Sequence, residues 1–179
     1  MLTALKLLGA LALLGGIALA VLIWRGAEPG GIDDLWQAVA GPPDLGPVAF
    51  EVLVRRARPN DALACPEGVC RRARPDIPSP VFPVPAERLR AIVAQVAAED
   101  PETQLVYTAR HEDQDRYVAR TPLMRFPDTI NVQVVPISAD ESTLALYSRS
   151  QIGYSDRGVN RRRIERWLER IAQRAGRQA

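Results

Sequence analysis

The residues best suited to chemistry lie between Gly153 and Arg163 of this 179-residue chain. Ser155 lies in the run Gly-Tyr-Ser-Asp-Arg-Gly, which is similar to a hydrolase nucleophile elbow but has one residue too many before the second glycine. A serine nucleophile also needs a base, and the single histidine, His111, belongs to a polar turn. The pattern therefore argues against a serine hydrolase, and no P-loop, dinucleotide, haem or metal motif takes its place.

The same stretch is consistent with either an anion site or a structural network. Free N–H groups at the start of a helix, with arginines nearby, bind phosphate or carboxylate. In the structural interpretation, which we favour, Asn160 caps the helix, Gly158 adopts a positive φ, and Asp156 pairs with Arg149 or Arg161. Both interpretations use the same residues, namely Arg149, Asp156, Asn160, Arg161 and Arg163.

One flank of the last helix is rich in arginine. Arg166, Arg170 and Arg174 recur at every fourth residue beside the apolar stripe, so like charges lie next to one another. Either this flank is solvated or pairs with acids elsewhere, such as those of residues 99–102, or it contacts anionic headgroups or an acidic partner. No motif or interleaved aromatic residues indicate nucleic acid.

The run from Leu7 to Trp24 is apolar and uncharged. At about 1.5 Å per residue it matches the core of a bilayer. The alternative is a signal peptide cleaved at Ala18-Leu19-Ala20, but the apolar run continues past that point. We therefore expect an uncleaved single-span anchor. Lys6 and the amino terminus precede the run and only Arg25 follows it, which favours an inner-membrane protein with a periplasmic C-terminal domain.

The two cysteines, Cys65 and Cys70, lie in a proline-rich segment. Their number and short spacing favour a disulfide in an oxidising compartment, and the alternative is two free thiols in a cytosolic loop. Zinc is disfavoured because no second pair of ligands accompanies them. We expect no metal and no cofactor.

Residues 1–25 are expected to form the transmembrane anchor and residues 26–47 a linker with a short juxtamembrane helix. That helix spans Ile32 to Ala40 and would bury Leu35, Trp36 and Val39. Residues 41–85 hold ten of the fifteen prolines. Within them we predict one strand, Val48 to Arg55, with Phe50, Val52 and Val54 on one face.

The pattern becomes regular after Pro85, and residues 48–179 are predicted to form one α+β domain. A helix from Pro85 has an apolar stripe of Leu89, Ile92, Val93 and Val96. Four strands follow, at 104–110, 116–121, 129–135 and 143–150. The last helix would bury Ile164, Trp167, Leu168, Ile171 and Ala175. This order predicts a two-layer sandwich, an antiparallel β-meander with helices on one face.

The run from Ser148 to Ile164, Ser-Arg-Ser-x-x-Gly-Tyr-Ser-Asp-x-Gly-Val-Asn-Arg-x-Arg-Ile, resembles the C-terminal signature of domain-of-unknown-function family 1499, found in bacteria and plastid-containing organisms. Cys65-Pro66, Cys70 and Phe126-Pro127-Asp128 also fit that family, and the resemblance covers residues 60–172. The family often has a second acid after Asp128, where this chain has Thr-Ile-Asn, and Arg71-Arg72 stand where small and hydroxyl residues are expected. The resemblance implies a fold but no activity.

These observations predict a non-catalytic binding or accessory protein, not an enzyme. We expect an accessory subunit of a larger membrane complex, with membrane lipid and a protein partner. The alternative is an extracytoplasmic module that binds anionic lipid or a small anion.

Overall fold

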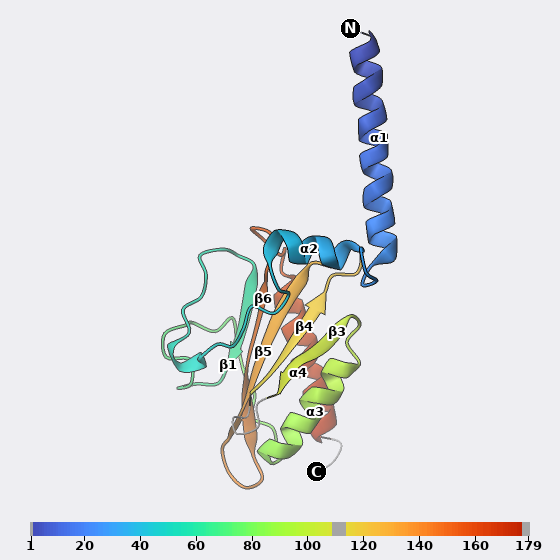
Figure 1. Cartoon of the computed structure of the whole chain (residues 1–179). Coiled ribbons are helices and arrows are strands. Elements are labelled where there is room, and N and C mark those ends of the chain that lie inside the picture. Colours follow the sequence, from blue (N-terminus) through green and yellow to red (C-terminus); the bar gives the residue numbers. More distant parts are fainter. Residues whose placement is uncertain (1, 109–113, 177–179) are drawn as a thin grey trace.

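An N-terminal helix stands apart from an α+β domain in the computed structural model, which describes residues 2–108 and 114–176 (Figure 1). This helix, α1 (Leu2–Arg25), contains the segment Thr3–Arg25, whose mean hydropathy is 2.5 and whose apolar window is not buried in the domain. It is long and apolar enough to cross a membrane, which supports the predicted anchor.

The domain is built on a six-stranded mixed sheet with the strand order β2-β1-β6-β5-β4-β3. The strands are β1 (Asp61–Cys65), β2 (Ile77–Pro78), β3 (Thr103–Thr108), β4 (Gln114–Arg120), β5 (Pro127–Pro136) and β6 (Ser142–Ser150). The predicted antiparallel meander of β3 to β6 is confirmed. Two strands were not predicted from the sequence: β1, which pairs antiparallel with β6, and β2, which pairs parallel with β1.

Two helices cover one face of the sheet (Figure 1). They are α3 (Ala86–Ala98) and α4 (Val159–Gly176), and their predicted apolar stripes are buried as expected. The main core lies between them and the sheet, where the rings of Tyr117 and Trp167 meet edge to face with centroids 5.7 Å apart. This arrangement is the predicted α+β fold.

The other face of the sheet is partly covered by the proline-rich segment, which forms a second core. Its buried members are Phe50, Leu53, Leu63, Cys65, Ala73, Ala145 and Tyr147. The disulfide between Cys65 and Cys70 closes a loop beside this core. The strand predicted at Val48 to Arg55 is wrong, because residues 50–52 form a single 3₁₀ turn, η1 (Phe50–Val52). Phe50 is buried there, whereas Val52 and Val54 are exposed.

The predicted juxtamembrane helix is α2 (Ile32–Ala40), which lies across one end of the sheet (Figure 1). Ile32 is buried, and Leu35 and Trp36 are half-buried. Val39, which was expected to be buried, is 71% exposed. The helix therefore presents part of its apolar surface to solvent.

Ion pairs and one indole hydrogen bond fix α2 to the sheet. Asp33 lies 2.8 Å from both Arg120 and Arg125. The Trp36 indole N–H donates to the Met124 carbonyl oxygen over 2.6 Å. These contacts reach the end of β4 and the loop that follows it, so α2 and that end of the sheet form one unit.

The residues between α2 and η1 follow the sheet. The Thr129 hydroxyl accepts a hydrogen bond from the Leu45 amide and donates one to the Pro43 carbonyl. The Asn131 side chain donates to the Gly46 carbonyl. The part of the predicted linker that follows α2 is thus hydrogen-bonded to β5.

Candidate functional site

The predicted site residues lie where β6 leads into α4, at the end of the sheet that carries α2 (Figure 1). Leu144 and Leu146 of β6 face the helices. Because side chains alternate along a strand, Ser148 and Ser150 face the helices as well. The first turns of α4 pack directly over these two serines.

A buried ion pair joins α4 to the start of β5. Arg163 Nη2 donates to Asp128 Oδ2 over 2.7 Å, and the two side chains are 6% and 2% exposed. Arg163 Nη1 also donates to Asn160 Oδ1 over 2.7 Å and to Ser148 Oγ over 3.0 Å. The guanidinium is therefore held by a carboxylate, an amide and a hydroxyl, as a buried charge requires.

Asn160 is the centre of this network and is fully buried. Its Nδ2 donates to Asp156 Oδ2 over 2.8 Å, to Ser150 Oγ over 2.9 Å and to the Asn60 carbonyl over 3.2 Å. Its Oδ1 accepts from Ser148 Oγ over 2.5 Å. Asn160 thus connects β6, α4 and the residue preceding β1.

The cap of α4 is Asp156, and the prediction that Asn160 caps this helix is wrong. Asp156 Oδ2 accepts from the backbone N–H of Asn160 over 2.8 Å, and Oδ1 accepts from that of Gly158 over 2.9 Å. The carboxylate also lies at the positive end of the helix dipole. Gly158 has a φ of 78°, which confirms the positive φ predicted for it.

Arg149 lies on the opposite face of the sheet. Its Nη2 donates to the carbonyls of Leu45 and Gly46 over 3.0 and 2.9 Å, and its guanidinium lies 5.7 Å from the Tyr147 ring centroid. Burial lowers the pKa of Arg149. The predicted pairing of Arg149 with Asp156 is wrong, because the sheet separates the two side chains.

Arg161 is on the surface of α4, where it pairs with Glu165 one turn later over 2.9 Å. The predicted Asp156–Arg161 pair is therefore wrong as well. Of the five predicted site residues, the structure brings Asp156, Asn160 and Arg163 together and leaves Arg149 and Arg161 apart. The partners missed by the sequence analysis are Asn60, Ser148 and Ser150, while Asp128 was noted without its arginine.

The arginine flank of α4 pairs with the C-terminal end of α3. Arg170 and Arg174 both contact the Glu99 carboxylate, with 2.7 Å for Arg174. The hydrogen bond from Arg174 lowers the pKa of Glu99. Arg166 lies 3.7 Å from Asp100 and remains more than half exposed. Pairing with the acids of residues 99–102, one of the two alternatives for this flank, is what the structure shows.

Ser155 is exposed in the loop between β6 and α4, and its Oγ accepts a hydrogen bond from the Arg157 amide over 3.2 Å. His111 lies outside the described residues. Thr108 and Gln114, on either side of that gap, lie at the opposite end of the sheet. Within residues 2–108 and 114–176, no three His, Cys, Asp or Glu side chains are placed to hold a metal ion.

A hollow of about 210 Å³ lies beneath the β6–α4 loop. Its lining mixes apolar side chains with carboxylates and hydroxyls. These residues are Thr121, Phe126, Asp128, Ser150, Ile152, Gly153, Ser155, Asp156, Arg157 and Val159. Asp128 and Asp156 are already engaged with Arg163 and Asn160, so the hollow borders the structural network.

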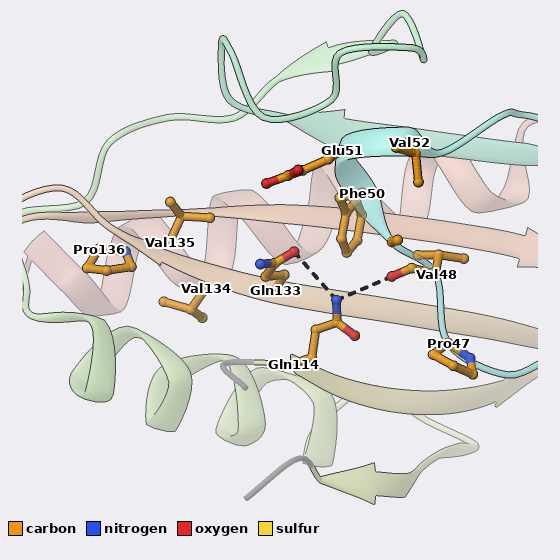
Figure 2. Close-up of a pocket in the computed structure, with 11 residues that line it drawn as sticks. Pro47, Val48, Phe50, Glu51, Val52, Gln114, Gln133, Val134, Val135 and Pro136 are labelled. Carbon is orange, nitrogen blue, oxygen red and sulfur yellow. Dashed lines mark hydrogen bonds between the residues drawn. The ribbon is translucent and has the colours of Figure 1, made fainter. Parts of the chain in front are cut away.

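An open groove of about 680 Å³ lies between η1 and the ends of β4 and β5 (Figure 2). Gln114 projects into it and donates to the Val48 carbonyl over 3.2 Å and to Gln133 Oε1 over 3.5 Å. Its walls are otherwise mostly apolar. The lining residues are Pro47, Val48, Ala49, Phe50, Glu51, Val52, Gln114, Gln133, Val134, Val135 and Pro136.

The protein thus belongs to the class of proteins with an apolar N-terminal helix and a single α+β domain, here with a buried polar junction between β6 and α4. The chain belongs to the family described as protein of unknown function (DUF1499), whose model matches residues 56–171. The match covers both the cysteine segment and the β6–α4 junction. A comparison with curated proteins gives no match.

Several solved structures are similar to the domain at low identity. A START superfamily protein from Mycobacterium smegmatis is 14% identical, with a TM-score of 0.43 over 57% of this chain and 97% of that chain. A protein from Thermobifida fusca is 18% identical, with a TM-score of 0.37 over 56% and 91%. The Zhui aromatase/cyclase from Streptomyces sp. R1128 is 10% identical, with a TM-score of 0.35 over 56% and 92%. The family match, and not these likenesses, identifies the chain.

Proposed function

We propose that this protein is a single-span, membrane-anchored, non-catalytic binding protein that acts as an accessory subunit of a larger membrane complex. The observation that carries this proposal is the groove between η1 and the ends of β4 and β5. We assign the groove to an extended segment of a partner protein.

The chemistry of the groove suits a peptide. Val48, Val52 and Val135 offer apolar contacts, and Val52 is 58% exposed. Gln114 and Gln133 present side-chain amides, which can hydrogen-bond to a peptide backbone.

The groove is poorly equipped for catalysis. Among the described residues that line it, Glu51 is the single ionisable one. General acid–base chemistry needs positioned titratable groups near the reacting atoms. The buried charges of Asp128 and Arg163 are bound to each other and lie in the helix-facing layer. These features support binding over reaction.

The location we propose is the inner membrane, with the domain on the periplasmic side. Helix α1 is evidence for a location in a membrane, and the Cys65–Cys70 disulfide is evidence for an oxidising compartment. The alternative function, binding of an anionic lipid or a small anion, has less support. Arg149, Arg161 and Arg163 point to three different places, and each has hydrogen-bond partners.

The test uses the full chain, tagged at its C-terminus and extracted from its own membranes in mild detergent. Val52→Arg places a charge in the groove, and Val54→Arg is the matched control because Val54 is as exposed but does not line the groove. We expect native mass spectrometry to show a stoichiometric protein partner with the wild type and with Val54→Arg. Val52→Arg should lose it.

A lone protein in all three samples would overturn the proposal, as would equal retention of the partner by both variants. Lipid-sized adducts on a lone protein, lost on Arg166→Glu and Arg170→Glu, would support the alternative instead. The proposal therefore depends on the difference between two neighbouring valines and not on co-purification alone.

A further inference from the structure

Three large apolar side chains are exposed at the end of the domain that α1 joins. Val39 of α2 is 71% exposed, Leu123 of the β4–β5 loop is 67% exposed, and Tyr154 of the β6–α4 loop is 70% exposed. They come from three separate segments, all of which lie at this end (Figure 1). Apolar side chains exposed at the end of a domain that is joined to a membrane span are placed to contact the membrane surface.

The connection between α1 and α2 is a closed turn. The Glu28 amide donates to the Arg25 carbonyl over 2.9 Å, and the Asp33 amide donates to the Gly26 carbonyl over 3.2 Å. A Cβ on Gly31 would lie 2.3 Å from the Gly26 carbonyl oxygen, so the turn requires glycine there. The anchor is therefore joined to the domain by a compact turn and not by an extended tether.

The loop that carries Tyr154 is fixed to the same unit. Gln151 Nε2 donates to the Ala40 and Pro42 carbonyls at the end of α2 over 2.8 and 2.7 Å. At the other end of the loop, Asp156 caps α4. The buried network thus holds the loop in place, while the loop leaves Tyr154 in solvent.

We propose that the α2 end of the domain rests on the lipid surface, with Val39, Leu123 and Tyr154 in the interfacial layer. This proposal rests on α1 crossing a bilayer, and it is independent of the groove and of which side the domain occupies. A compact turn after a membrane span places this end next to the headgroups. Tyrosine is enriched at that depth, and apolar side chains of surface-bound segments enter the acyl boundary.

The opposite end of the sheet supplies the control. The turn between β5 and β6 lies at the far end of the sheet from α1 (Figure 1). Ile137, in that turn, is 51% exposed. Like the three contact residues, it is apolar and more than half exposed. If the domain rests on the membrane as we propose, Ile137 is held away from it by the length of the sheet.

The experiment reconstitutes the full chain into vesicles of phosphatidylethanolamine and phosphatidylglycerol. Leu123→Cys, Tyr154→Cys and Ile137→Cys are each labelled with one fluorophore, because Cys65 and Cys70 are bonded to each other. A nitroxide on the upper acyl chain should quench the labels at 123 and 154 several-fold more than the label at 137. A water-soluble quencher should give the reverse order.

A second set of variants tests the contact itself. Tyr154→Asp should reduce the lipid quenching of a label at Leu123→Cys, whereas Ile137→Asp should leave it unchanged. These positions are exposed, and circular dichroism in detergent checks that each variant keeps the fold. Equal lipid quenching at 123, 154 and 137 would overturn the proposal, and so would an unchanged signal in the Tyr154→Asp variant.

Discussion

Arg163 of α4 donates a 2.7 Å hydrogen bond to Asp128 at the start of β5, and the two side chains are 6% and 2% exposed. This pair joins the helix layer to the sheet at the junction that carries the family signature. Removing one member of a buried pair leaves the other charge without a partner, which destabilises more than the pair stabilises. Loss of Arg163 would also remove the hydrogen bonds that its guanidinium donates to Asn160 and Ser148.

Arg163→Met is therefore expected to lower the free energy of unfolding by about 3–5 kcal/mol. Urea denaturation followed by tryptophan fluorescence measures this change. Arg161→Met is the control, because Arg161 and Glu165 form an exposed pair one helical turn apart that contributes about 0.5 kcal/mol or less. The double variant Asp128→Leu and Arg163→Met should recover part of the loss. Equal effects of Arg161→Met and Arg163→Met would contradict the buried pair.

Asp156→Ala tests which residue caps α4. Loss of the cap should lower the free energy of unfolding by about 1 kcal/mol. Asp156→Asn should lower it less, because its one amide oxygen can still replace one of the two accepting carboxylate oxygens. Ser155→Ala, which removes an exposed hydroxyl from the same loop, should change it by a few tenths at most. Thermal or chemical denaturation of the three variants tests this assignment. An Asp156→Ala variant as stable as the wild type would show that Asp156 is not the cap.

The regular elements from α3 to α4 could be predicted from the sequence because their apolar residues recur with a helical or a strand period. Leu89, Ile92, Val93 and Val96 show the helical period of α3, and alternation marks the central strands. Among the described residues, the predicted ends of the strands lie within two residues of the observed ends. The His111 turn lies outside the described residues.

The first half of the domain could not be predicted because its burial follows no simple period. Strand β1 is buried on both faces, with Ala62 and Ala64 in the main core and Leu63 and Cys65 in the second core, so it shows no alternation. Residues 48–55 alternate in sequence but do not form a strand. Phe50 and Leu53 are the buried pair, and their spacing of three residues suits a 3₁₀ turn.

Part of the candidate site could be predicted from the sequence, namely the residues of the motif but not their partners. The motif led to Asp156, Asn160 and Arg163, but their partners come from distant segments. One signal for the buried arginine was present, because Arg163 lies four residues before Trp167 on the apolar stripe of α4. Strand alternation would also have placed Arg149 on the face opposite Ser148. No sequence pattern, however, links Asn60 to this junction.

Acid should weaken the Asp44–Arg116 contact, which holds the segment before η1 on the sheet. Burial alone would raise the pKa of Asp44, but hydrogen bonds from Arg116 and Gly46 lower it below its ordinary value of 3.8. This pair therefore contributes stability above pH 3.8, and the contribution is lost as the pH falls through the lower pKa of the folded state. Asp44→Asn should lower the free energy of unfolding at neutral pH by about 1 kcal/mol and flatten its decline in acid.

The measurement for Asp44 is a series of urea denaturation curves between neutral and strongly acidic pH. Asp140→Asn, in the exposed β5–β6 turn, is the matched control and should keep the wild-type pH profile. A profile for Asp44→Asn that also matches the wild type at every pH would show that the Asp44–Arg116 contact does not contribute.

The Cys65–Cys70 disulfide predicts both a stability effect and a compartment. It closes a short loop at the end of β1, so its removal in Cys65→Ala/Cys70→Ala should lower the free energy of unfolding by about 2 kcal/mol. Val69→Ala, within the same loop, is a control that leaves the cross-link in place and should have a smaller effect.

The disulfide also tests the compartment. Free thiols are trapped by alkylation in intact cells and counted after denaturation. A domain on the periplasmic side should show no alkylated cysteine until a reductant is added, because the bond forms and persists only in an oxidising compartment. Full alkylation without a reductant would place the domain in the cytosol and reverse the proposed orientation of α1.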